Sequence, residues 1–139
     1  MAEIGIVRKF RAGVAPLAAL CFVTAFPARA GEVYTPKPGG AVREAIFDAM
    51  RDADHDHDRV YVERYLKAQD GWAWLVADPQ SRDGKNRYET ESALIRLETI
   101  GKWTVVARPC AEADCDPKKE MARIRAENPH APAAIFPHR

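Results

Sequence analysis

The chain has 139 residues, of which 47% are hydrophobic and 29% charged, and its formal net charge is +1. This length suits a single domain. The balanced charge argues against a strongly basic nucleic-acid-binding protein and against a highly charged disordered chain. The sequence contains no phosphate loop and no dinucleotide fingerprint, so we expect no cofactor.

The first thirty residues have the layout of a secretory signal peptide. A basic cluster within residues 8–11 precedes an apolar run over 12–26, and the small residues Ala28 and Ala30 follow. This order is typical of a signal peptide cleaved between Ala30 and Gly31. The apolar run is shorter than the roughly 20 residues of a membrane-spanning helix.

The predicted organisation is therefore a signal peptide over 1–30 and one small domain over 31–139. Without the leader the chain carries a slight negative charge, and we expect a bacterial protein that is periplasmic or secreted. Two alternatives stay open: an uncleaved membrane anchor, and a lipoprotein modified at Cys21. Leu20 stands where a lipoprotein signal has Gly or Ala.

The domain opens with an irregular, Pro- and Gly-rich segment over 31–40, and a helix is predicted from 41 to about 53. Val42, Ile46 and Met50 recur at i, i+4 and i+8, which places them on one side of this helix. We expect this amphipathic helix to pack on a core; binding of a partner by the same stripe is the alternative.

Four strands should follow. The first begins near Val60 and ends before the hairpin signal Asp70-Gly71, and the others span about 72–77, 92–98 and 103–107. Hairpin-sized loops predict antiparallel pairing. Alternation places Trp72, Trp74 and Val76 on one side of the second strand. In the first strand, alternation predicts an apolar face that is interrupted by Arg64 and consists of Val60, Val62, Leu66 and Ala68. The other face is mixed and consists of Tyr61, Glu63, Tyr65 and Lys67.

Cys110 and Cys115 should form a structural disulfide if the protein is exported. Their spacing is not that of a Cys-x2-Cys redox site, although a redox pair, free thiols or half a metal site are alternatives. Asp116-Pro117 predicts the start of a helix that runs to about Glu127 and buries Met121 and Ile124.

The tail over 131–139 should be extended. The order of elements predicts an α+β fold. Its N-terminal amphipathic helix packs on a four-stranded antiparallel meander sheet, followed by a short C-terminal helix and the extended tail.

Two groups of residues are candidate sites. His55 and His57, within the acidic run 54–58, could ligate zinc, copper or nickel, and a solvated helix-to-strand connection is the plainer interpretation. A second group could line a small-ligand pocket between helix and sheet, with or without simple hydrolytic activity: Tyr61, Arg64, Tyr65 and Trp74. Packing in the core is the alternative for its aromatic members. No catalytic residue is assigned.

Several segments together resemble a family of small exported bacterial proteins of unknown function. They include Tyr-Thr-Pro-x-Pro-Gly over 34–39, the helix segment 45–51, Gly-Trp-Ala-Trp over 71–74, the segment 101–106 and Ala-Ile-Phe-Pro at the end of 132–137. The resemblance implies an exported α+β domain and brings no activity or catalytic residue with it.

The sequence favours a periplasmic, non-enzymatic binding or accessory protein whose partner is another envelope protein. We expect no nucleic-acid partner and no membrane span after signal cleavage. The small-ligand pocket and weak metal binding by the His-Asp run are the alternative functions. The sequence does not indicate an oligomeric state.

Overall fold

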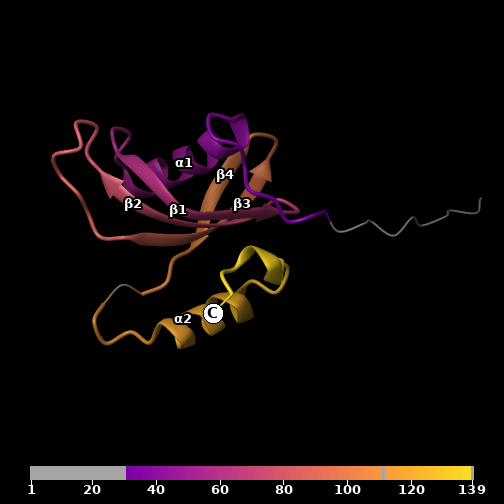
Figure 1. Ribbon diagram of the computed structural model, residues 1–139. Helices are drawn as coiled ribbons and strands as arrows, with labels where there is room; N and C mark the ends of the chain where they lie inside the picture. Colours follow the sequence, from indigo (N-terminus) through magenta and orange to yellow (C-terminus); the bar gives the residue numbers. More distant parts are fainter. Residues whose placement is uncertain (1–30, 111, 139) are drawn as a thin grey trace, which may run out of the picture.

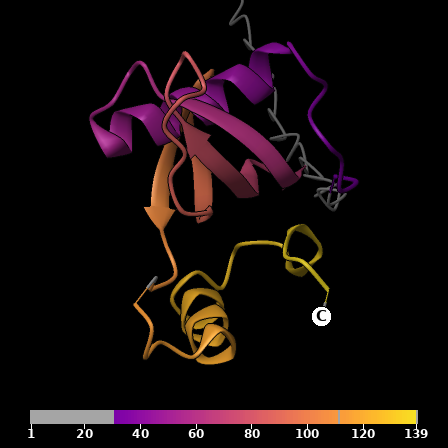
Figure 2. The same ribbon diagram turned by 60° about the vertical axis from the view of Figure 1, so that its left-hand side comes forward.

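The computed structural model describes residues 31–110 and 112–138, so the predicted signal peptide and Ala30 lie outside the described residues. Helix α1 covers one face of a four-stranded antiparallel sheet, and α2 with the end of the chain covers the other (Figures 1 and 2). The strands lie in the order β1-β2-β3-β4. The elements are α1 (Ala41–Asp54), β1 (Val60–Gln69), β2 (Trp72–Gln80), β3 (Glu91–Thr99), β4 (Lys102–Ala107), α2 (Pro117–Glu127) and the short 3-10 helix η1 (Ala133–Ile135).

The predicted α+β class with a four-stranded antiparallel sheet is confirmed. Among the described residues the first helix is α1 at Ala41–Asp54, close to the predicted range of 41 to about 53. Strand β2 continues to Gln80, beyond the predicted end at Ala77, because Pro79 still pairs with Tyr61 of β1. Among the described residues, no helix is long and apolar enough to cross a membrane.

Helix α1 is stabilised mainly by its packing against the sheet, because its N-terminus has no side-chain cap. Gly40 precedes it and offers no side chain to cap the first turn. The helix buries Ile46, Phe47 and Met50 against the sheet. The sheet side of this core combines four alanines with larger side chains such as Leu66, Leu75 and Ile95; the alanines are Ala68, Ala73, Ala77 and Ala93. The predicted apolar stripe therefore packs inward, although Val42 stays exposed near the start of the helix.

The predicted faces of β1 are wrong because the strand contains a bulge at Arg64. The pairing with β2 shifts between Glu63 and Tyr65, so Arg64 has no partner of its own in the register. An extra residue of this kind reverses which side of the sheet the following side chains face. Tyr61 therefore lies in the α1-side core, while Tyr65 packs on the opposite face.

The second core lies between the sheet and the C-terminal segment. Trp74 and Leu94 of the sheet are fully buried there by Ile124 of α2 and by Ile135 and Phe136 of the tail. The Trp74 and Phe136 rings lie 5.2 Å apart. The prediction of an extended tail is wrong at Ala133–Ile135, which form a 3-10 turn. This turn brings the Ile135 carbonyl oxygen within 3.0 Å of the Tyr65 hydroxyl that donates to it.

Two local features follow strands of the sheet: a tight hairpin turn after β1 and a disulfide-closed loop after β4. Asp70 and Gly71 both have positive φ, 50° and 76°, as a two-residue type I′ hairpin turn requires. Beyond β4, the predicted disulfide joins Cys110 to Cys115, whose Cα atoms lie 5.9 Å apart. Closing so short a loop contributes about 2 kcal/mol on the chain-entropy model.

Candidate functional site

The His-Asp run serves mainly as the end of α1. His55 takes the left-handed conformation that ends the helix, and its N–H donates to carbonyl groups of the last turn. His57 is exposed, with Nδ1 3.6 Å from an Asp52 carboxylate oxygen. Within the described ranges 31–110 and 112–138, no group of three or more His, Cys, Asp or Glu side chains is placed to hold a metal ion.

Asp54, the first residue of the run, lies at the centre of a charged cluster. Its side chain is 7% exposed and contacts Arg59 Nη1 at 3.1 Å and Arg108 Nη2 at 2.7 Å. The Tyr61 hydroxyl donates to the same carboxylate. Glu91 lies 3.4 Å from each of the two arginines. We call these five residues the Asp54 cluster; they tie the end of α1 to β1, β3 and β4.

Burial raises the pKa of Tyr61, and the hydrogen bond to Asp54 raises it further, so this phenol stays protonated. Burial, followed by the nearby Asp54 carboxylate, also raises the pKa of Glu91 above its ordinary value of 4.5. The cluster satisfies its charges internally, and its geometry is that of a structural clamp.

The raised pKa of Glu91 predicts a pH dependence. Because the folded state holds this proton more tightly than the unfolded state, the contribution of Glu91 to stability is complete below about pH 4.5. That contribution is lost as the pH rises through the higher folded pKa. The unfolding free energy of Glu91→Gln, relative to the wild type, should therefore increase with pH across this window. Urea unfolding at several pH values measures it, and exposed Glu89→Gln is the control for loss of a carboxylate outside the Asp54 cluster.

The structure does not gather the four predicted ligand-binding residues into one site. Tyr61 belongs to the α1-side core and the Asp54 cluster. Tyr65 and Trp74 pack in the core on the opposite face. Only Arg64 among the four lines a described hollow, at the end of the sheet near the β2–β3 connection.

That hollow around Arg64 is polar, with a volume of about 380 Å³. Arg64 Nε donates to Asp78, and the Thr90 hydroxyl donates to the other carboxylate oxygen of Asp78 at 2.6 Å. The hydrogen bond from Thr90, followed by that from Arg64, lowers the pKa of Asp78. The acidic group is therefore held in its charged form, as an ion-pair partner of Arg64.

A different, apolar hollow lies at the hairpin end of the sheet, beside the start of α1. It has a volume of about 340 Å³. We call it the hairpin groove; its lining is Tyr34, Ala41, Val42, Ala45, Gly71, Leu97, Gly101 and Trp103. The groove lies where the β1–β2 turn, the β3–β4 hairpin and the start of α1 meet. The first two are linked by a hydrogen bond in which Leu97 N donates to Gly71 O at 2.8 Å.

Large apolar side chains are exposed around the hairpin groove. Tyr34, Val42 and Leu97 are each more than a third exposed, and Ile100 is fully exposed. Ile100 occupies the β3–β4 turn, where Gly101 takes the positive φ of 77° that side-chain-bearing residues rarely adopt. The turn therefore presents an isoleucine to solvent beside an uncharged hollow.

Comparisons of the chain with protein-family models, curated proteins and solved structures gave no match.

Sequence reasoning missed both the hairpin groove and the Asp54 cluster. The signal for the first was Ile100, an apolar residue in a two-residue turn that would ordinarily hold polar residues. The signal for the second was weaker, because Arg59 and Arg108 flank strands that are distant in sequence. Only the folded sheet brings these arginines to one carboxylate.

Proposed function

We propose that this protein is a non-enzymatic accessory protein of the bacterial cell envelope, and that it binds another envelope protein through the hairpin groove. The observation that carries the proposal is the fully exposed Ile100 beside the uncharged groove. Contiguous apolar surface of this kind typically marks an interaction site in a soluble domain. The partner should present an apolar side chain for the groove and an uncharged hollow for Ile100.

The shape of this surface favours a protein over a small ligand. A small ligand gains most of its affinity from burial inside a cavity. Here Val42 and Leu97 form an exposed rim, and Ile100 projects instead of lining the hollow. A projection beside a hollow is matched by a partner surface with the opposite relief, as at protein–protein interfaces.

Contacts at Gly31 support an exported protein cleaved after Ala30. The Gly31 nitrogen donates to Asp70 Oδ1 at 2.7 Å, and the Gly31 carbonyl accepts from Gln69 at 2.6 Å. In a chain that begins at Gly31 the contact with Asp70 would become an ion pair with the new amino terminus. The Cys110–Cys115 disulfide is also compatible with an oxidising compartment.

Photo-crosslinking in intact cells tests the proposed function. A benzophenone amino acid at Leu97 should give one reproducible adduct with an envelope protein, and the same residue at Tyr88, at the other end of the sheet, should not. Mass spectrometry identifies the adduct and should also show a chain that begins at Gly31.

The purified partner is then titrated with the wild type and with Ile100→Asp. The variant should bind at least about tenfold more weakly, because it places a charge in an apolar contact.

The matched control is Val62→Asp, which places the same charge on another exposed β-branched residue away from the groove. This variant should bind the partner like the wild type. Equal weakening by both variants, an adduct only with a second copy of the chain, or equal adducts from the two crosslinker positions would each overturn the proposal.

A further inference from the structure

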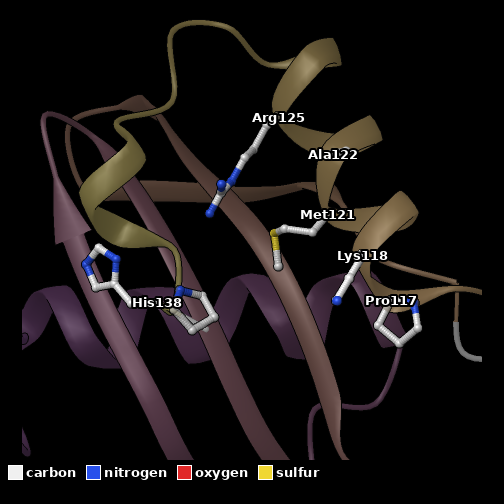
Figure 3. A pocket seen from close by; sticks show the side chains of 7 residues that line it. Pro117, Lys118, Met121, Ala122, Arg125 and His138 are labelled. Carbon is white, nitrogen blue, oxygen red and sulfur yellow. The ribbon is translucent and has the colours of Figure 1, made fainter.

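Helix α2 and the end of the chain border another open hollow, on the opposite side of the sheet from α1 (Figure 3). Its volume is about 340 Å³. In Figure 3 the side chains of Lys118, Met121 and Arg125 extend from α2 toward the side on which His138 lies. We call this hollow the α2 groove; its lining includes Pro117, Lys118, Met121, Arg125, Pro137 and His138.

The α2 groove collects positive charge that its own lining does not neutralise. Lys118 and Arg125 stand seven residues apart, on one face of the helix. Among the described residues that line the groove none is acidic, and neither of these two side chains has an ion-pair partner in the part of the chain that the structure describes. By contrast, Arg123 is not in this lining and lies 2.9 Å from Glu120 and 2.7 Å from Glu127.

Arg125 is also oriented by the core. Its guanidinium carbon lies 4.6 Å from the ring centre of Phe136, which is fully buried. A guanidinium stacked in this way keeps its N–H groups at its edge, where they match the two oxygens of a carboxylate. Beside it, Met121 and the two prolines supply apolar surface, and the thioether of Met121 adapts to ligands of different shape.

We propose that the α2 groove binds a small amphiphilic carboxylate, with its anionic group between Lys118 and Arg125 and its apolar chain against Met121 and the prolines. The volume is at the lower end of the range for small-molecule pockets, so a single short chain fits. This site lies on the opposite face of the sheet from α1 and shares no lining residue with the hairpin groove. It does not depend on the proposed protein partner.

Titration of the ¹⁵N-labelled protein with octanoate tests this inference. Octanoate should shift the amide signals of residues 118–125 and those of Phe136 and His138 in a saturable manner at up to millimolar concentration. Octanamide, which has the same chain and no charge, should bind about tenfold more weakly because it has no anionic group to form an ion pair with Lys118 and Arg125. Arg125→Gln should weaken octanoate binding by a similar factor, and Arg125→Lys by less.

Lys119→Gln is the matched control, because it removes a charge from the same helix outside the groove lining. This variant should bind octanoate like the wild type. Unchanged amide signals from α1 in Arg125→Gln would show that the fold is retained. Equal binding of octanoate and octanamide, no effect of Arg125→Gln, or binding to phosphatidylglycerol vesicles without any response to octanoate would overturn the proposal, the last in favour of a membrane surface.

Discussion

Replacing Phe136 with alanine is expected to lower the free energy of unfolding by about 4 kcal/mol, the range found when a buried phenylalanine is truncated. The ring is 1% exposed and packs 5.2 Å from that of Trp74. Its loss leaves a cavity beside Trp74 and removes the surface on which Arg125 stacks. Urea unfolding followed by tryptophan fluorescence measures the change, since Trp74 reports directly on this core.

Ile100→Ala serves as the control for the Phe136 experiment. It also removes a large apolar side chain, but Ile100 is fully exposed, so its loss should change the unfolding free energy by no more than about 0.5 kcal/mol. A cost below about 1 kcal/mol for Phe136→Ala would contradict the packing of the C-terminal segment on the sheet, because true core positions cost more.

Asp54→Asn is expected to destabilise the protein by about 3 kcal/mol, because removal of one partner leaves buried opposite charges uncompensated. The substitution keeps the size of the side chain and removes the charge that faces both Arg59 and Arg108. The estimate lies at the low end for buried pairs, since Arg108 is partly exposed and both arginines also contact Glu91. Equilibrium unfolding in urea gives the value.

The matched control for Asp54 is Asp52→Asn on the same helix. The Asp52 side chain is 72% exposed, and its contact with His57 is 3.6 Å long. Surface substitutions of this kind change stability by about 0.5 kcal/mol or less. If both substitutions had the same small effect, the Asp54 cluster would not be a stabilising clamp.

The elements of the fold were predictable because each has a local cause. The apolar spacing of Ile46 and Met50 predicts α1, the Asp70-Gly71 pair predicts the first hairpin, and Asp116 predicts the start of α2. The structure bears these out: Asp116 Oδ1 accepts from Lys118 N at 2.8 Å, and the Asp-Gly turn has both residues at positive φ. Each signal needs only neighbouring residues, and none depends on the partner across the sheet.

The sequence predictions that were wrong concern segments whose conformation depends on contacts with residues distant in sequence. In the sequence Arg64 interrupts an apolar face of β1, but strict period-two alternation does not allow for an extra residue in a strand. Only the register with β2 shows the bulge that moves Tyr65 to the other side. The predicted ligand-binding group failed to assemble for the same reason. Likewise, the 3-10 turn over Ala133–Ile135 packs on β1 and cannot be inferred from the tail alone.

The C-terminal segment also determines the order in which the molecule can be completed. As synthesis proceeds, α1 and all four strands exist before Ile135 and Phe136 have been added. Until then Trp74 and Leu94 have no cover on their side of the sheet. Incomplete chains that expose apolar surface of this kind aggregate readily. The core on this side of the sheet can therefore form only after Ile135 and Phe136 have been added. A chain truncated before these residues would still contain all four strands, but one face of its sheet would lack its apolar cover.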